Sequence, residues 1–223
     1  MTVPSLVLGR TRRSARTSLL VGLLATLAIG SSGVADAASL TPLGFNFVTN
    51  PGGELGAGGS GEVLPVPTWK KTSTFTVVKY GTVGYPSTVV RDAANGQVNF
   101  MFCGLNTSAS VARQRIAISG QDALIDSAGL TLSISVRIGA TGTEGDRGQM
   151  IVTYLNAAGA GIGTLKTATV TNNDGQMVRT SADGLVPAGT RAVRVALQGK
   201  GFVGTTCDVY FDNVSVKLVA VAP

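Results

Sequence analysis

Apolar and polar residues alternate along most of the chain after residue 41, with the period of two that marks a half-buried β-strand. The clearest run is Leu130–Ile138, where Leu, Ile and Val alternate with Thr, Ser and Arg. Shorter runs of the same kind lie around Phe75–Val77, Val98–Phe102, Ile116–Ile118, Met150–Tyr154 and Val193–Leu197. The pattern predicts a chain built almost entirely of short strands.

Segments rich in glycine and small polar residues separate these runs, among them RDAANG, GATGTEGDRG, NAAGAGIG and TNNDG. Asn95-Gly96 and Asp174-Gly175 are dipeptides typical of tight turns. Only QDALIDSAG, residues 121–129, has the composition of a short helical turn. Many short strands with regularly spaced turns predict an all-β fold, an antiparallel β-sandwich.

The run CDVYFDNVSVKL, residues 207–218, breaks the alternation. Val209 and Phe211 share one phase, whereas Val214 and Leu218 share the other. Asp212 falls in the second phase, so a regular strand would point its carboxylate the same way as core side chains. A one-residue slip at this aspartate is what a β-bulge produces, and bulges redirect side chains.

Residues 1–37 have the three parts of an export signal. A basic stretch comes first, with Arg10, Arg12, Arg13 and Arg16. The apolar stretch 19–29 is too short for a membrane span, and Ala35-Asp36-Ala37 is a small-x-small cleavage pattern. The alternative is an uncleaved anchor helix. Arg12-Arg13 leaves the export route open.

Cleavage after Ala37 leaves residues 38–223 as a single domain, which we expect to be secreted and extracellular with no membrane segment. The full chain has a net charge of +6, and the signal holds four of its 18 basic and one of its 12 acidic residues. The mature chain therefore keeps 14 basic and 11 acidic residues, a net charge of +3. Bases such as Lys70, Arg113 and Arg194 are scattered as on a solvated sheet face, so we do not expect nucleic acid as a partner.

The chain has two cysteines, Cys103 and Cys207. In an exported protein an even pair indicates a disulfide. The bond would close a loop 104 residues long, for which chain entropy gives about 4–5 kcal/mol of stabilisation at most. The alternative is a pair of free buried thiols.

Five short motifs together resemble the galactose-binding-like jelly roll of many secreted carbohydrate-binding modules. In chain order they are FNFVTNPGGE (45–54), VPTW (66–69), RQRIAIS (113–119), VPAGTRAVRVAL (186–197) and YFDNVSVKL (210–218). The resemblance covers residues 41–220 and implies that 45–54 is the first strand of the domain. It also implies that Trp69 belongs to the core.

The resemblance further implies a structural calcium ion held by Glu54 and Asp212 with backbone carbonyls beside them. Calcium accepts hard oxygen ligands of this kind, and a bound cation would offset the cost of burying the Asp212 carboxylate. The family usually has an aromatic residue before the glutamate, where this chain has Gly53. The alternative is that Asp212 accepts hydrogen bonds from backbone amides, pairs with an arginine or sits at the rim of the sheet.

The sequence has no histidine, which removes His-based general bases and His-dependent triads. A pair of carboxylates for glycoside hydrolysis remains a possibility. The candidates are Glu62, Asp92, Glu144 and Asp146, all in turns that resemble ordinary solvated loops. We therefore expect a protein that is not an enzyme.

A glycan site needs aromatic platforms and a few fixed polar groups. Tyr80 and Tyr85 flank a turn and are candidate surface platforms. The loop GTEGDRG supplies Glu144, Asp146 and Arg147, which have the right chemistry to hydrogen-bond sugar hydroxyls. The alternative for this loop is a solvated hairpin tip.

The phenylalanines Phe45, Phe47, Phe100 and Phe102 alternate like core residues, and Tyr210, in phase with Asp212, is a candidate for burial. The function that fits this pattern is reversible, non-catalytic binding of a glycan or cell-surface polysaccharide at a loop end or sheet face. The main alternative is a structural or adhesive exoprotein of the same fold with no sugar site. A jelly-roll hydrolase or lyase is a third reading.

Overall fold

A computed structural model describes residues 41–141, 144–171 and 174–221. The expected export signal at 1–37 and its cleavage site lie outside the described residues. Two short helices are present, α1 (Thr88–Ala94) and α2 (Asp122–Asp126). The strands are β1 (Lys70–Lys71), β2 (Thr76–Lys79), β3 (Asn99–Gly104), β4 (Ala109–Ala117), β5 (Leu130–Ala140), β6 (Arg147–Leu155), β7 (Gly161–Lys166), β8 (Val170–Thr171), β9 (Val178–Leu185), β10 (Ala192–Lys200) and β11 (Cys207–Ala220).

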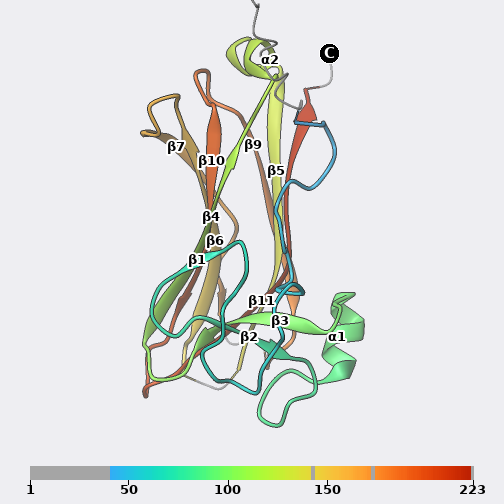
Figure 1. The fold of residues 1–223 in the computed structure, drawn as a ribbon, viewed down its shortest axis with the longest axis vertical. Helices are drawn as coiled ribbons and strands as arrows, with labels where there is room; N and C mark the ends of the chain where they lie inside the picture. Colours follow the sequence, from blue (N-terminus) through green and yellow to red (C-terminus); the bar gives the residue numbers. More distant parts are fainter. Residues whose placement is uncertain (1–40, 142–143, 172–173, 222–223) are drawn as a thin grey trace, which may run out of the picture. The chain divides into compact units, whose positions relative to one another are not determined.

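The strands form two antiparallel sheets, which confirms the predicted β-sandwich. The six-stranded sheet has the order β1-β4-β10-β6-β7, with β8 also pairing with β6. The five-stranded sheet has the order β2-β3-β11-β5-β9. The two sheets form the two layers of the domain (Figure 1). The last two strands of the chain, β10 and β11, therefore lie at the centres of the two sheets.

The main core fills the space between the sheets. Aliphatic side chains from β5, β10 and β11 meet there, and Trp69 joins them with 6% of its surface exposed, as predicted. The sheets approach each other closely at Gly148, where an added Cβ would lie 2.6 Å from Val209 Cγ1. The predicted disulfide is confirmed: Cys103 of β3 is bonded to Cys207 of β11 inside this core.

The expected bulge in the last strand is present. Asp212 is opposite Arg137 of β5, but the next paired residue, Ser215, is opposite Ser135, so β11 has one residue more than its partner. Asn213 takes up the irregularity with φ at 51°. The bulge restores the core phase after residue 213, and Asp212 therefore points to the outer face of the sheet and away from the main core.

A second hydrophobic cluster covers that outer face. Tyr210, Phe100 and Phe102 project from the sheet and are fully or almost fully buried, as Tyr210 was expected to be. Tyr80 packs on Phe100, with ring centroids 4.8 Å apart. The short helix α1 also contributes to this cluster through Ala94. The five-stranded sheet therefore buries side chains on both faces near this end.

Three expectations about local structure were wrong. Residues 45–54 form an irregular segment and no strand, because Asn46 and Asn50 replace ladder bonds with side-chain bonds. Phe45 is 67% exposed, so it is no core residue, although Phe47 packs partly against the core. The first four residues of RDAANG belong to α1, and Asn95 caps its C-terminus with φ at 54°. At the N-terminus of this helix the Ser87 hydroxyl accepts from Val90 N, 3.4 Å away.

The predicted helical turn in residues 121–129 is confirmed as α2. In the described part of the chain, neither helix has the length or apolar content needed to cross a membrane.

Candidate functional site

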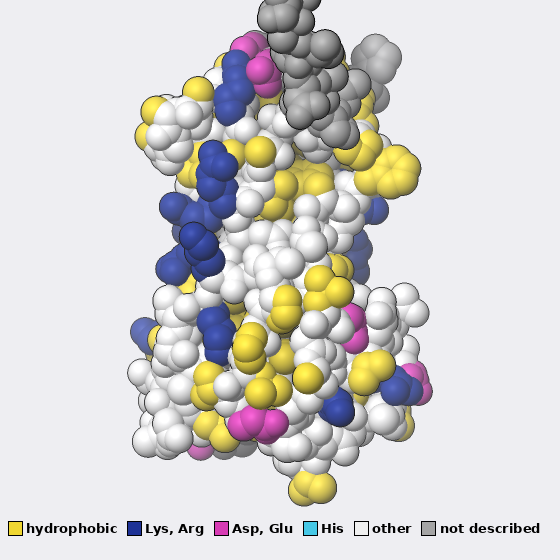
Figure 2. All heavy atoms as spheres, viewed as in Figure 1, with side chains coloured by type: hydrophobic (Ala, Val, Ile, Leu, Met, Phe, Trp, Pro, Cys, Tyr) yellow, Lys and Arg dark blue, Asp and Glu magenta, His cyan; other side chains and the backbone are white. Residues whose placement is uncertain are grey.

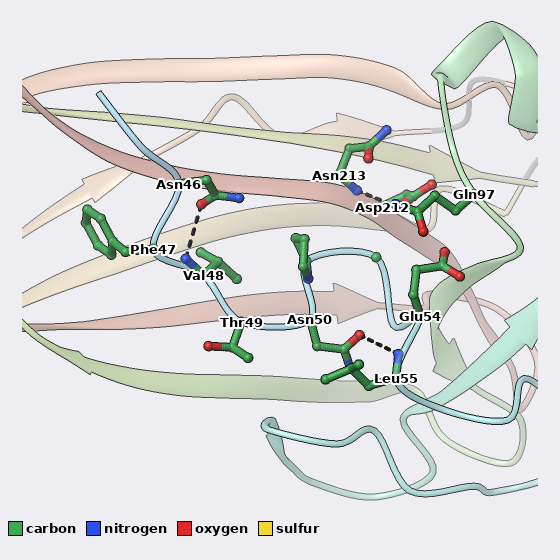
Figure 3. A pocket seen from close by; sticks show the side chains of 12 residues that line it. Asn46, Phe47, Val48, Thr49, Asn50, Glu54, Leu55, Gln97, Asp212 and Asn213 are labelled. Atoms are coloured by element: carbon green, nitrogen blue, oxygen red, sulfur yellow. Dashed lines mark hydrogen bonds between the residues drawn. The ribbon is translucent and has the colours of Figure 1, made fainter. Parts of the chain in front are cut away.

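A cleft of about 600 Å³ lies between the irregular segment 46–55 and the bulge of β11. Its volume is in the range of small-ligand sites. Figure 3 shows side chains from both walls around it, with Glu54, Gln97 and Asp212 gathered at one end. The other lining residues are Asn46, Phe47, Val48, Thr49, Asn50, Pro51, Gly52, Leu55 and Asn213.

Two asparagines hold the first wall in place. Asn46 Nδ2 donates to Val214 O at 2.8 Å, and Asn46 Oδ1 accepts from Val48 N and Val216 N. Asn50 Oδ1 accepts from Leu55 N at 3.0 Å, a bond that closes the turn before Glu54. These two side-chain amides hold the irregular backbone of the first wall in place. Leu55, which is 63% exposed, extends from this backbone and lines the edge of the cleft.

Asp212 is the buried polar group at the end of the cleft, with 1% of its surface exposed. Its Oδ2 accepts from the Tyr80 hydroxyl at 2.8 Å, and its Oδ1 accepts from Asn213 N at 2.6 Å. Burial raises the pKa of this carboxyl from 3.8 to about 7, despite these two bonds. The hydrogen bonds are thus too few to compensate for the loss of water around the charge.

Glu54 lies beside Asp212. Its carboxylate accepts from Asn99 N at 3.1 Å and from Val98 N at 3.3 Å. Burial raises the pKa of Glu54 above its ordinary value, and these backbone bonds offset part of the rise. An added Cβ on Gly52 would lie 2.6 Å from Asp212 Oδ1 and 3.4 Å from Glu54 Oε1, so these two oxygens are no more than 6.0 Å apart.

Among the described residues, no cation forms an ion pair with either carboxylate, although Arg137 lowers the pKa of Asp212 through its charge. Arg137 lies opposite Asp212 in the ladder, but its guanidinium donates to Met177 O at 2.9 Å. Across the described ranges, no ion pair involves Glu54 or Asp212. The two carboxylates lie close together and have free lone pairs, and Gly52 leaves space beside them. They form a donor set that fits a hard cation such as Ca²⁺.

Gly53 has φ at +85°, and an added Cβ would meet Val77 Cγ2 at 2.8 Å. The aromatic residue that the family usually has at this position therefore has no room here.

A second acidic group lies on the 144–147 loop and the start of β11. Carboxylate oxygens of Glu144, Asp146 and Asp208 all lie within 4.8 Å of one another, and the group has the composition to hold a metal ion. Asp146 is fully buried, which contradicts the expectation of a solvated hairpin tip at this residue. It accepts from Asp208 N at 2.7 Å and Phe202 N at 3.1 Å, so it ties the loop to β11.

Of the remaining site candidates, Tyr80 and Tyr85 both pack on Phe100 in the outer-face cluster. Tyr80 is buried, and Tyr85 is half-buried against Phe102, so neither is the open platform expected from sequence. Arg147 is exposed and lies 4.1 Å over the Phe202 ring. Among the carboxylates considered for hydrolysis, Glu62 accepts from Ser60 N and Asp92 pairs with Arg91 on the surface.

Sequence reasoning missed several cleft residues. Asn46 and Asn50 lie in a segment that was expected to be a strand, Gln97 follows a predicted turn, and the roles of all three depend on contacts with distant parts of the chain. The role of Tyr80 as the donor to Asp212 was also missed, because the two are 132 positions apart. An available signal was the NPGG run after Asn46, since asparagine favours side-chain bonds to the backbone of irregular segments.

No protein-family model matches this sequence, and no curated protein matches it. Solved structures do match. The enzymatically active domain of tailspike protein 4 from bacteriophage CBA120 is similar with a TM-score of 0.52 and 13% identity, over 78% of this chain and 21% of that chain. This chain thus spans about a fifth of the tailspike chain. A Stig cyclase from Fischerella sp. TAU is similar with a TM-score of 0.52 and 14% identity, over 79% of this chain and 98% of that one.

Carbohydrate-binding modules are also among the similar structures, as the sequence resemblance led us to expect. TmCBM61, solved with β-1,4-galactotriose, has a TM-score of 0.45 and 14% identity over 79% of this chain and 99% of that chain. The CBM22-1 xylan-binding domain from Paenibacillus barcinonensis Xyn10C has a TM-score of 0.42 and 11% identity, over 69% of this chain and 87% of its own. At these identities the comparisons concern the fold alone, a two-sheet β-sandwich.

Proposed function

We propose that this protein is secreted and binds a glycan reversibly, without covalent chemistry, in the cleft between residues 46–55 and the bulge of β11. The observation that carries the proposal is the composition of this cleft. Amide and carboxylate groups suited to sugar hydroxyls lie beside the apolar side chains of Phe47 and Leu55. Sugar sites need this combination of fixed polar groups and apolar surface.

Two further features support the proposal. The histidine-free sequence and the bonding of both cysteines to each other leave few groups for nucleophilic or general-base catalysis. The disulfide also fits an oxidising compartment outside the cytoplasm, in keeping with the export signal expected at 1–37.

The proposal includes a structural Ca²⁺ held by Glu54 and Asp212. A bound cation supplies the positive charge that these two carboxylates lack. The ion would fasten segment 46–55 to β11, the two walls of the cleft, and Tyr80 would hold the Asp212 carboxylate in orientation through its 2.8 Å bond. The role of the ion is structural and stabilises the cleft in its binding shape.

The test is a screen of the protein on an array of neutral and acidic oligosaccharides, followed by titration calorimetry with the best ligand. Leu55→Ala and Gln97→Ala each remove an exposed cleft side chain. We expect Leu55→Ala to weaken binding by about fivefold, since the loss of one well-placed apolar contact costs about 1 kcal/mol. Val89→Ala, 74% exposed on α1, is the matched control.

If the array retains no sugar, or if both cleft variants bind like the wild type, the cleft is not a glycan site. The structural or adhesive exoprotein is then the better description. Turnover of an oligosaccharide during the titration would instead overturn the non-catalytic part of the proposal.

A further inference from the structure

The two sheets differ sharply in charge. The strands of the six-stranded sheet contain no Asp or Glu at all. They carry eight basic residues, namely Lys70, Lys71, Arg113, Arg115, Arg147, Lys166, Arg194 and Lys200. The five-stranded sheet, in contrast, mixes both signs. Positive charge is therefore concentrated on one layer of the domain.

The ladder register brings four of these cations together on the solvent face. Lys70 of β1 lies directly opposite Arg113 of β4, and Arg115 of β4 lies directly opposite Arg194 of β10. Arg113 and Arg115 are two residues apart on one strand and therefore project to the same side. All four side chains are exposed. Together with Thr68 and Gln114 they line a hollow of about 450 Å³.

This arrangement costs the fold free energy. Like charges directly opposite in an antiparallel pair are destabilising, and here two such pairs stand side by side. Over residues 41–141, 144–171 and 174–221, none of the four cations forms an ion pair or a side-chain hydrogen bond. Within these ranges, no anion of the protein pairs with the four cations to compensate for the repulsion.

The basic surface continues along the same face. Lys200 of β10 is opposite Arg147 of β6, and Gln198 is opposite Gln149 in the adjacent row. Lys200 lies six positions after Arg194 along β10, which corresponds to roughly 20 Å of strand. Figure 2 shows Lys and Arg side chains aligned in a column on the side of the molecule formed by this sheet. We call this track, from Arg194 and Arg115 to Lys200 and Arg147, the basic face.

We propose that the basic face binds an extended, carboxylated polysaccharide. Guanidinium groups recognise carboxylates with two parallel hydrogen bonds, and a polymer with a carboxylate on each sugar presents such groups at regular intervals. A track about 20 Å long accommodates several sugars of one chain, with Gln149 and Gln198 placed to bond hydroxyls between the charges. This surface is separate from the cleft of Glu54 and Asp212 and goes beyond the binding proposed there.

A nucleic acid is the other polyanion to consider. Proteins that hold single strands stack bases on aromatic side chains, but the outward positions of β4, β10 and β6 carry none, since Tyr154 points into the core. The exposed ring of Phe202, beside the end of the basic face, is already stacked against Arg147 and Lys200. Reading a duplex takes a helix or ribbon that enters a groove, whereas this surface is the face of a sheet. The composition of the face thus favours sugar carboxylates.

The test measures the affinity of the full chain for polygalacturonate, for a neutral galactan of similar length, and for single- and double-stranded DNA. The variant Arg115→Gln/Arg194→Gln removes one of the like-charge pairs. The control Arg179→Gln/Lys217→Gln removes the same charge from the five-stranded sheet. We expect polygalacturonate to bind, with affinity that falls as NaCl is raised. The affinity of the Arg115→Gln/Arg194→Gln variant for polygalacturonate should fall about tenfold, as expected for the loss of two exposed charge contacts. The affinity of the control variant should fall less than twofold.

Stability gives a second readout. Since Arg115 and Arg194 repel each other, the first variant should unfold at the same temperature as the wild type or higher. The proposal is overturned if polygalacturonate does not bind, if both double variants lose affinity equally, or if DNA binds more tightly and responds to the same variant. Neutral oligosaccharide binding, with its dependence on Leu55, reports on the cleft independently, so failure at one surface is distinguishable from failure at the other.

Discussion

The substitution Asp212→Asn tests the electrostatics of the candidate site. In the metal-free protein the Asp212 pKa is about 7 in the folded state and 3.8 in an ordinary environment. Below about pH 4 the carboxyl is protonated in both states. Between pH 4 and pH 7 the unfolded chain loses this proton while the folded protein keeps it, so the folded state becomes less stable as pH rises. The difference of about three pKa units corresponds to about 4 kcal/mol.

The asparagine variant removes this charge at every pH. It also weakens the hydrogen bond from the Tyr80 hydroxyl, which costs about 1 kcal/mol. In EGTA at pH 8 the variant should therefore be about 3 kcal/mol more stable than the wild type, or about 10 °C higher in melting temperature for a domain of this size. At pH 5 the two proteins should melt within a few degrees of each other.

With calcium at pH 8, the wild type should become more stable than the asparagine variant. A ligand present at a thousand times its dissociation constant stabilises the folded state by about 4.1 kcal/mol, which exceeds the advantage of about 3 kcal/mol that the variant has in EGTA, and only the wild type retains both carboxylates. The assay is thermal unfolding by circular dichroism at pH 5 and pH 8, with EGTA and with calcium. Asp183→Asn, an exposed carboxylate on β9, is the control.

Two results would refute this reasoning. If the wild type in EGTA melts at the same temperature at pH 5 and pH 8, Asp212 is neutralised within the protein and needs no cation. If calcium raises the melting temperatures of the wild type and the asparagine variant equally, the ion binds elsewhere, and the Glu144, Asp146 and Asp208 group is the next place to examine.

Three other substitutions have defined outcomes. Tyr80→Phe removes a hydrogen bond to a charged group and should cost about 1.5–3 kcal/mol at pH 8, with little effect at pH 5 in a melting experiment. Gly148→Ala places a methyl group 2.6 Å from Val209 Cγ1 and should cost about 1–3 kcal/mol in urea unfolding, whereas Gly163→Ala, with its nearest contact at 3.4 Å, should be close to neutral. Cys103→Ser/Cys207→Ser opens a loop spanning 104 residues and should lower stability by up to about 4–5 kcal/mol, and the wild type in reductant should match it.

The sequence was most informative where one face of a strand is buried. The alternation at Leu130–Ile138 predicted β5, and the phase slip in 207–218 predicted the bulge at Asp212, because period-two patterns depend only on local geometry. The disulfide followed from the even number of cysteines. These features need no knowledge of which strands pair with which.

Features that depend on distant contacts were missed. Phe100 and Phe102 are buried, as expected of core residues, but they lie on the outer face of the sheet with Tyr80, Tyr85 and α1, a location that no local pattern encodes. Tyr80 was expected on the surface for the same reason. The hydrogen-bond donors to Asp212 are Tyr80 and Asn213. Those to Glu54 are Val98 and Asn99. The cleft therefore exists only after the sheet has formed. The charge asymmetry between the sheets was hidden because the sequence alone did not reveal the register of β1, β4 and β10.

The central positions of β10 and β11 determine when the domain is able to fold. β3 and β5 are both complete by residue 140, but the strand that pairs with both of them is β11, at the end of the chain. In the same way, β4 and β6 both pair with the later strand β10. A nascent chain that stops before residue 192 therefore has neither sheet complete, and Cys103 has no partner until Cys207 is made. The domain is completed only near the end of synthesis, because its contacts are predominantly long-range. A polypeptide whose two sheets are completed only when its final strands emerge is well suited to passing through a narrow translocation channel and to folding on the far side.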